Sequence, residues 1–380
     1  MAKAAKVAAP KAAAAKSSTA AKTMRLPKGV VRPREAVLRM QPYSPPTAGR
    51  AGKLRLDFNE NTVGCSPRVV EFLKRRLDAG GLAVYPEYGE AKAELAQFFG
   101  VRTEEFVFTN GTDEAIQIFL NTYVDPGQEV LLLRPAYAMY RFYAQVAGAR
   151  IRELDYQGPA LDFPLGAVLD AITPATRAVL IANPNNPTGT GLSLLSIERI
   201  LKRARAAVVF LDEAYFEFSG VTALSHIARV PNLFVSRTFS KVYGMAAMRL
   251  GCLFSDPANI AFLHKAQSPY SVNSLAVLAA QAAIRDTAYI ENYVAEVLAA
   301  RELLCLGLER LQIPYVPSAA NFVLIRAGAR ALDVRDRLGA RGILVRDRSY
   351  EAPGCVRITA GTREQTRRLL GALEEIWLRP

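Results

Sequence analysis

The sequence predicts an α/β protein, with a large domain whose mostly parallel sheet is sandwiched by helices and with a smaller α+β domain after it. Five short apolar runs, separated by helix-length amphipathic stretches, occupy residues 129–133, 177–182, 207–211, 232–235 and 250–254. Such runs are typical of parallel strands buried on both faces and joined by helical crossovers. After about residue 270 the pattern becomes helical over residues 274–311, and short strand-like pieces follow at 322–325, 343–345 and 356–359. This change predicts the second domain.

Length and composition fit an enzyme-sized globular chain. The 380 residues are 51% hydrophobic, enough for one large core or two moderate ones. No run of 18 apolar residues occurs, and the N-terminal lysines interrupt any apolar block of the signal-peptide kind. We therefore expect a soluble, cytoplasmic protein without a membrane partner.

Cysteine and histidine usage argues against two classes of site. The four cysteines are scattered with no CxxC pair, and the chain has only two histidines, His226 and His264. A structural zinc site needs clustered ligands, so we expect no metal. A Ser/His/Asp or Cys/His hydrolase would need one of these histidines in a recognisable motif, and neither stands in one.

The net charge of +13 is concentrated at the N-terminus. Residues 1–34 hold nine basic residues and no acid, which leaves +4 for the remainder. The tail is nearly all Ala, Lys, Ser, Thr, Val and Pro, and without large apolar residues it predicts a disordered basic segment. A transit peptide or a nucleic-acid contact is the alternative. Both are disfavoured, because arginine is absent before residue 25 and no aromatic residue interleaves the lysines.

The first chemical motif runs from Phe106 to Ile116, where a strand-like run meets Gly111 and a helix predicted to begin at Thr112 or Asp113. A helix start presents free N–H groups and the positive end of the helix dipole, which together bind a phosphate. An ordinary helix cap is the alternative, and by itself the motif does not decide between them.

A second motif, the polar loop from Ala182 to Thr190, follows the apolar run 177–182. Ligands bind at the carboxyl ends of strands in open parallel sheets, so Asn186 can donate a hydrogen bond to a cofactor oxygen there. Turn chemistry alone is the competing explanation.

Asp212 stands 26 residues beyond Asn186, at the end of the apolar run 207–211. A carboxylate beside a buried strand needs a partner, and a protonated ring nitrogen would supply one and turn the ring into an electron sink. Tyr215 can bond the phenolic oxygen of the same ring. The alternative is a helix-capping Asp with a core Tyr.

The third motif, residues 236–251, places Lys241 among hydroxyls and an arginine. A Schiff-base lysine needs a desolvated or electropositive pocket, and Arg249 would favour its unprotonated form. Thr238, Ser240 and Arg249 can also hold a phosphate. A solvated surface lysine fits poorly, because the segment is apolar and glycine-rich and contains no acid.

With these motifs, the chain resembles the fold-type I pyridoxal-phosphate (PLP) aminotransferases, and among them the histidinol-phosphate aminotransferases. The resemblance spans roughly residues 35–375. Its pieces stand in order: Gln41-Pro-Tyr, Leu56-Asp-Phe-Asn-Glu-Asn, Tyr85-Pro-Glu-Tyr-Gly, Asn110-Gly-Thr-Asp-Glu, Pro135-Ala-Tyr-Ala-Met-Tyr, Pro184-Asn-Asn-Pro-Thr-Gly, Asp212-Glu-Ala-Tyr, Thr238-Phe-Ser-Lys, Ser268-Pro-Tyr-Ser-Val-Asn, Asn321-Phe, Leu344-Val-Arg-Asp and Val356-Arg-Ile-Thr-Ala-Gly-Thr.

The resemblance implies a role for each matched residue. Lys241 would carry PLP as a Schiff base, Asp212 would pair with the pyridine nitrogen, and Asn186 and Tyr215 would bond the ring oxygen. Tyr137 would stack on the ring. The phosphate would be cradled by Gly111, Thr112, Asp113, Thr238, Ser240 and Arg249, with Tyr85 reaching over from a second subunit. The substrate would be held by Tyr43, Asn59, Arg346 and Arg357.

The resemblance also implies an organisation and a reaction. The expected segments are a basic tail (1–34), an N-terminal arm (35–62), a large PLP-binding domain (63–270) and a small C-terminal domain (271–380), in a homodimer with shared active sites. The expected reaction is a ping-pong transamination of L-histidinol phosphate with 2-oxoglutarate, a step of histidine biosynthesis. Three alternatives stay open: an aromatic amino-acid aminotransferase, a threonine-phosphate decarboxylase, and a binding or regulatory protein that keeps the scaffold without turnover.

Overall fold

A computed structural model describes residues 31–42 and 47–378. The chain divides into two units, Met1–Tyr43 and Ser44–Pro380. The described part of the first unit contains one short helix, α1 (Glu35–Leu38). All that follows concerns the second unit.

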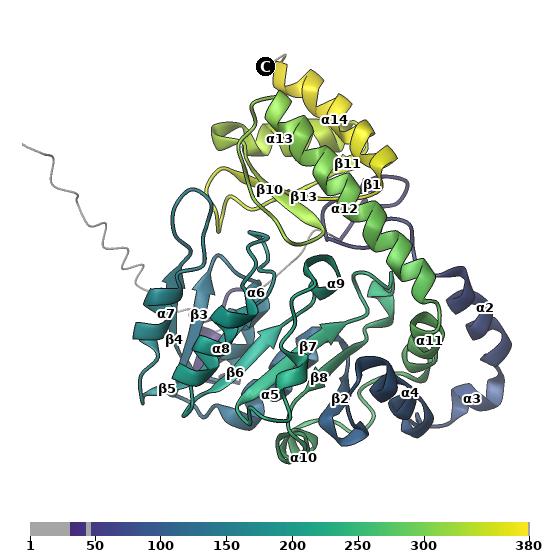
Figure 1. Ribbon diagram of the computed structural model, residues 1–380, viewed down its shortest axis with the longest axis vertical. Helices are drawn as coiled ribbons and strands as arrows, with labels where there is room; N and C mark the ends of the chain where they lie inside the picture. Colours follow the sequence, from purple (N-terminus) through teal and green to yellow (C-terminus); the bar gives the residue numbers. More distant parts are fainter. Residues whose placement is uncertain (1–30, 43–46, 379–380) are drawn as a thin grey trace, which may run out of the picture. The chain divides into compact units, whose positions relative to one another are not determined.

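A seven-stranded sheet forms the centre of the second unit (Figure 1). Its order is β2 (Phe106–Thr109), β8 (Gly251–Phe254), β7 (Leu233–Thr238), β6 (Val208–Asp212), β5 (Thr176–Ala182), β3 (Glu129–Arg134) and β4 (Arg150–Asp155). The strands β7, β6, β5, β3 and β4 pair in parallel, whereas β8 is antiparallel to both β2 and β7. The mostly parallel sheet that the sequence predicts is therefore confirmed.

Alternate residues of each central strand enter two different cores. Val179, Ile181 and Leu211 face one core, while Leu180 and Phe210 face the other. Period-two alternation of apolar residues on both sides is expected only when both faces of a sheet are covered. The sheet is thus sandwiched, as the sequence predicts.

Helices supply the covering layers. The first core contains residues of α4 (Gly89–Phe99), α7 (Leu165–Ala171), α8 (Leu194–Arg203) and α11 (Ser274–Ile284). The second contains residues of α5 (Gly111–Tyr123), α6 (Ala138–Val146) and α10 (Pro257–Ala266). Two further helices, α2 (Pro67–Arg76) and α3 (Ala79–Ala83), follow one another just before α4.

The helical pattern predicted over 274–311 corresponds to two helices. Helix α11 ends at Ile284, and α12 runs over Thr287–Arg310. Asp286 interrupts the helix between them, with backbone angles outside the helical region, and its carboxylate accepts a hydrogen bond from Ser66. Asp side chains bond readily to nearby groups outside helices, which the apolar periodicity of the segment does not reveal.

A second sheet follows in the C-terminal part. Its order is β12 (Arg346–Asp347), β13 (Cys355–Thr359), β10 (Phe322–Arg326) and β9 (Tyr315–Val316), all antiparallel. The helices α12, α13 (Ala331–Ala340) and α14 (Arg363–Leu378) contribute to its core. Strand β1 (Leu54–Arg55) pairs in parallel with β11 (Ile343–Leu344), which ties the segment before residue 62 to this part of the chain. The domain boundaries given above stay a prediction.

Candidate active site

The predicted site residues gather at the carboxyl edge of the parallel strands. Asp212 ends β6 and Thr238 ends β7, while Asn186 and Tyr137 stand in the segments that follow β5 and β3. Ligands of open parallel sheets bind at this edge. The fold therefore brings together residues from four separate stretches of sequence.

The reversed direction of β8 brings Arg249 to the same edge. Because β8 is antiparallel to β2 and β7, its first residue, Gly251, lies opposite the last residues of those strands, Thr109 and Thr238. Arg249 precedes it in a left-handed conformation (φ 56°). Its guanidinium lies so close to Gly111 that a Cβ at that position would collide with it. Gly111 also has φ 75°, a left-handed conformation that glycine adopts without strain, and α5 begins at this residue, one before the predicted start.

The start of α5 fits a phosphate group. The helix is 13 residues long, and its first N–H groups have no partner within the helix. Thr112 Oγ1 is buried and forms no hydrogen bond with any residue of the described ranges. Such an orphaned hydroxyl costs about 1 to 3 kcal/mol unless a ligand oxygen bonds to it. Thr238 and Ser240 are also buried, and the Ser240 N–H donates to Thr238 Oγ1 at 3.1 Å.

Asp113 organises this region. Its carboxylate accepts a hydrogen bond from the Tyr137 hydroxyl at 2.8 Å and pairs with Arg249 Nη2 at 3.3 Å. A carboxylate repels a phosphate, so Asp113 can offer the anion only its backbone N–H. Its side chain orients Tyr137 and Arg249 instead.

Asp212 is a buried carboxylate without a cationic partner among residues 31–42 and 47–378. Tyr140 donates to its Oδ2 at 2.7 Å, and Ser236 Oγ and the Ala214 N–H donate to its Oδ1 at 3.0 and 3.1 Å. Burial raises the pKa of Asp212, and these hydrogen bonds oppose the rise. A protonated ring nitrogen would provide the missing positive charge.

A hydrogen-bond network joins Tyr215 to the C-terminal sheet. The Asn59 side-chain amide donates to the Tyr215 hydroxyl at 3.0 Å, and Thr359 Oγ1 donates to Asn59 Oδ1 at 3.0 Å. Asn59 is buried with φ 55°, a region that Asn tolerates better than most residues. Nearby in the same network, Arg357 Nη1 donates to Asn186 Oδ1 at 2.5 Å and Nη2 donates to the Asp57 carbonyl at 2.6 Å.

Lys241 lies between these groups. Its Nζ donates to the Phe58 carbonyl at 3.0 Å and stands 5.8 Å from the centre of the Tyr215 ring. The side chain is half-buried and forms no ion pair with any described residue. It is therefore not the solvated surface lysine considered above.

Arg357 and Arg346 are direct partners across strands β13 and β12. Arg357 is buried, and its Nε has no hydrogen-bond partner within the described ranges. Burial, with Arg348 and Arg346 adding positive charge, lowers the pKa of Arg357 to about 10. The Arg346 guanidinium lies 5.3 Å from the centre of the Phe58 ring. Two neighbouring guanidinium groups with an unsatisfied donor fit an anion.

One predicted residue, Tyr85, stands apart from this cluster. Tyr85 is 73% exposed and stacks on Tyr270, with ring centres 4.4 Å apart. Tyr43 lies outside the described residues. The structure thus brings together the described residues that were predicted from one chain, and the residue assigned to a second subunit lies at the surface.

Three groups that contribute to the site were not predicted from the sequence motifs: the Tyr140 and Ser236 side chains and the Phe58 carbonyl. Tyr140 and Ser236 belong to quoted motifs and stand three residues after Tyr137 and two before Thr238. The spacing of two places Ser236 and Thr238 on the same side of β7. A backbone carbonyl such as that of Phe58 leaves no trace in residue identities.

The sheet, its helical layers and the residues at its carboxyl edge agree with one class of protein, the PLP-dependent aminotransferases of fold type I. A family model, "Aminotransferase class I and II", matches residues 51–373. The chain belongs to this family.

Curated relatives extend the likeness. A histidinol-phosphate aminotransferase of Symbiobacterium thermophilum is 37% identical over 356 residues, which cover 90% of this chain and 97% of that protein. A histidinol-phosphate aminotransferase of Geobacillus is 37% identical over 335 residues, covering 85% of this chain and 90% of that one. These relatives match along nearly their whole length.

Solved structures share the fold. Histidinol-phosphate aminotransferase from Sinorhizobium meliloti, in complex with pyridoxal-5'-phosphate, superposes with a TM-score of 0.83 at 24% identity, over 92% of this chain and 99% of that one. Aspartate aminotransferase from Thermus thermophilus gives a TM-score of 0.75 at 24% identity, over 85% and 91% of the two chains. Both likenesses confirm the fold-type I architecture.

Proposed function

We propose that this enzyme transfers the amino group of L-histidinol phosphate to 2-oxoglutarate, giving imidazole-acetol phosphate and glutamate in histidine biosynthesis, with PLP as its cofactor. The observation that carries the proposal is the pairing of Arg357 and Arg346 across β13 and β12, with Arg357 donating to Asn186 in the loop that follows β5. The names of the curated relatives support the same substrate.

The cofactor's phosphate has a fitting cradle. We assign it to the N–H groups of Gly111, Thr112 and Asp113, to the hydroxyls of Thr112, Thr238 and Ser240, and to Arg249. The buried, unpartnered Thr112 hydroxyl supports this assignment. Tyr137, whose hydroxyl donates to Asp113, would stack on the cofactor ring.

Bound PLP supplies a carbonyl that receives the amino group and a ring that withdraws electrons from the reacting carbon. Asp212 favours a protonated ring nitrogen, because its buried carboxylate has no other cation to pair with. Asn186 and Tyr215 would bond the ring oxygen. Lys241 Nζ would remove the proton from the substrate carbon that bears the amino group and would later deliver a proton to the carbon that receives the amino group.

One anion pocket must serve both substrates. Histidinol phosphate carries a phosphate and no carboxylate, whereas glutamate carries two carboxylates. Guanidinium groups bind both kinds of anion through paired N–H donors. We assign this pocket to Arg357, Arg346 and Asn59, and the substrate-binding role of Tyr43 stays a prediction from the sequence.

The experiment that tests the substrate compares turnover of histidinol phosphate, phenylalanine and tyrosine, each with 2-oxoglutarate as acceptor. Histidinol phosphate should be preferred by kcat/KM. Preference for phenylalanine or tyrosine by orders of magnitude would assign an aromatic aminotransferase instead. Release of CO₂ from threonine phosphate would assign a decarboxylase, and absence of turnover with every donor would assign a binding protein.

We further propose a cytoplasmic homodimer in which Tyr85 completes the partner's phosphate site. The exposure of the stacked Tyr85 and Tyr270 rings supports a role outside the single chain. Mixing inactive Lys241→Ala and Tyr85→Ala subunits tests it, since a mixed dimer then holds one site with both residues intact. Activity should recover to about a quarter of the wild-type value, because half of the dimers are mixed and each has one complete site. No recovery would contradict the shared site.

Neither a membrane nor nucleic acid is proposed as a partner. No helix within residues 31–42 and 47–378 is long and apolar enough to span a membrane. The tail predicted from residues 1–34 falls mostly outside the described residues, and its role stays a prediction. Unchanged activity after removal of residues 1–30 would support a tail without a catalytic role.

A further inference from the structure

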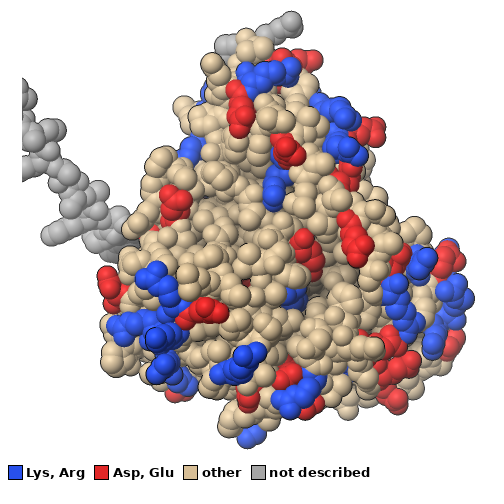
Figure 2. Space-filling view, in the orientation of Figure 1, with Lys and Arg blue, Asp and Glu red and all other residues tan. Residues whose placement is uncertain are grey.

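A cavity of about 440 Å³ lies on the first-core side of the sheet, apart from the Lys241 cluster. Its walls come from the end of α4, from α9 (Phe216–Ser219), from the loop around Thr222, from β7 and from the start of α12. Figure 2 shows a hollow near the centre of this face. Few Lys, Arg, Asp or Glu side chains are visible around it. The volume is in the range of cavities that hold small molecules.

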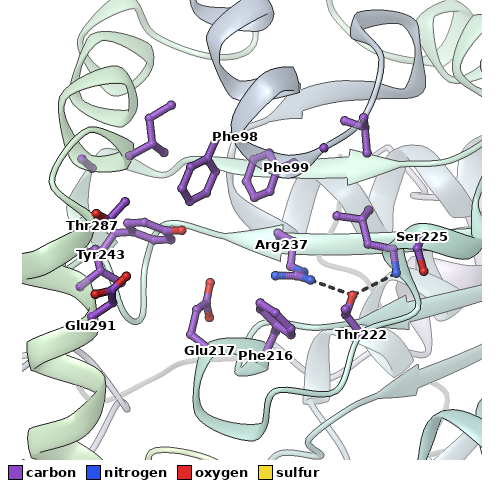
Figure 3. Close-up of a pocket in the computed structure, with 16 residues that line it drawn as sticks. Phe98, Phe99, Phe216, Glu217, Thr222, Ser225, Arg237, Tyr243, Thr287 and Glu291 are labelled. Atoms are coloured by element: carbon purple, nitrogen blue, oxygen red, sulfur yellow. Dashed lines mark hydrogen bonds between the residues drawn. The ribbon is translucent and has the colours of Figure 1, made fainter.

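Aromatic rings form much of the lining. Phe98 and Phe99 reach the cavity from α4, Phe216 from α9 and Tyr243 from the loop after β7, and apolar side chains such as Leu224 add to the lining. In Figure 3 Phe98, Phe99 and Tyr243 stand across the cavity from Phe216. Aromatic faces carry negative partial charge and attract cations.

Two carboxylates reach the same cavity. The Glu217 carboxylate points into the space between Tyr243 and Arg237 (Figure 3), and Glu291 lines the cavity from α12. Neither forms an ion pair with a residue that the structure describes. Glu291 is exposed and solvated, whereas Glu217 is half-buried, and its ionised form in a largely apolar space is costly unless a cation pairs with it.

The one basic side chain of the lining is already neutralised. Arg237 Nε and Nη2 both lie 2.8 Å from Glu213 Oε2, and its guanidinium also donates to Thr222 and stacks 3.6 Å over the Phe216 ring. Glu213 and Arg237 are both buried. The ionised Glu217 therefore has no free basic side chain in this lining to pair with.

We propose that this cavity binds a small organic cation, whose apolar body packs among the aromatic rings while its charge lies beside Glu217. Aromatic rings together with a carboxylate are the combination that recognises alkylammonium groups. The cavity is distinct from the anion pocket of Arg357 and Arg346, which repels such a ligand. The site goes beyond the transamination proposed above and does not depend on it.

The protonation of Glu217 supports the same ligand. Burial raises the pKa of Glu217 to about 7, against the opposing effect of Arg237, and Glu213 raises it further. The titratable groups that face it are Arg237 and Glu213 from the sheet edge, Tyr243 from the following loop and Glu291 from α12. A bound cation favours the ionised form, so its affinity should rise as the pH increases through 7.

The test is calorimetric titration of the PLP-loaded enzyme with benzyltrimethylammonium, which cannot form a Schiff base. It should bind about tenfold more tightly than benzyl alcohol, and phenylacetate should bind most weakly. Saturating 2-oxoglutarate should leave the dissociation constant unchanged. Equal affinity for the three probes, no binding of the cation, or competition with 2-oxoglutarate would overturn the proposal.

Variants locate the site. Glu217→Gln keeps the shape and should weaken cation binding about tenfold and abolish its pH dependence. Phe98→Ala, at a side chain that is 40% exposed, should weaken it about threefold without affecting the fold. Glu302→Gln removes an exposed acid from the same helix as Glu291, about 17 Å further along, and should change nothing. Wild-type affinity and pH dependence in Glu217→Gln would show that the cation binds elsewhere.

Discussion

Tyr140 donates a 2.7 Å hydrogen bond to Asp212 Oδ2, and both side chains are buried. This bond lowers the pKa of a carboxylate whose burial raises it. Asp212 can balance a protonated ring nitrogen only while it is ionised. Tyr140 is therefore a positioning residue that acts through Asp212.

Tyr140→Phe should lower kcat about tenfold, because a hydrogen bond to a charged group contributes about 1.5 to 3 kcal/mol. The acidic limb of the kcat profile should move to higher pH, since the pKa of Asp212 rises further without its donor. Steady-state kinetics over a pH series measure both effects. Tyr143→Phe, on the same helix, removes a hydroxyl for which no hydrogen bond is found among described residues and serves as control. An unchanged pH profile would show that Tyr140 has only a packing role.

Arg357→Lys should raise KM for histidinol phosphate on the order of 30-fold, or about 2 kcal/mol. An ammonium group cannot satisfy Asn186, the Asp57 carbonyl and a substrate anion with the planar geometry of a guanidinium. Cofactor affinity, measured by absorbance titration, should stay the same. Arg367→Lys at an exposed position is the matched control. A fall in kcat with an unchanged KM would contradict a role in substrate binding.

Two substitutions of Asn59 can separate the effect of backbone strain from that of hydrogen bonding, because the φ of 55° at this position suits glycine better than alanine. Asn59→Gly and Asn59→Ala both remove the bond to the Tyr215 hydroxyl and should lower turnover equally. Asn59→Ala should also lose about 1 kcal/mol more of unfolding free energy than Asn59→Gly. Denaturant unfolding measures the difference. Equal stability of the two variants would mean that the backbone relaxes at this position.

Glu217 makes stability depend on pH. Its pKa is about 7 in the folded chain and 4.5 without burial, so the folded state binds more protons between these values. Stability attributable to this group is therefore fully present below pH 4.5 and declines as the pH rises through 7. Glu217→Gln should be up to about 3 kcal/mol more stable than wild type at pH 8, with the two equal near pH 4. Denaturant unfolding at several pH values measures this, and a gap that does not change with pH would contradict it.

Periodicity predicted the sheet and its covering helices because burial on both faces leaves a direct pattern in the sequence. It could not predict the direction of β8, since an apolar run such as 250–254 looks the same in either orientation. That direction places Arg249 beside Gly111. The local break at Asp286 was missed for a similar reason, because apolar periodicity continues on both sides of it.

The candidate site was predictable where function needs particular side chains in short motifs, as with Lys241, Asp212 and Asn186. Contacts between distant segments were not predictable. The bond from Asn59 to Tyr215 joins residues 156 positions apart, and the bond from Lys241 goes to a backbone carbonyl. No single motif predicts the aromatic cavity, because several separate segments form it and the residues of each are typical of an ordinary core.

The central claim is that Lys241 moves the proton in a PLP-dependent transamination. Turnover of Lys241→Ala with histidinol phosphate and 2-oxoglutarate tests it most directly, alongside the visible absorbance of the bound cofactor. Turnover should fall by at least about a thousandfold, because general acid–base catalysis and covalent attachment are both lost, while the protein still binds PLP. Normal turnover in Lys241→Ala would contradict the account.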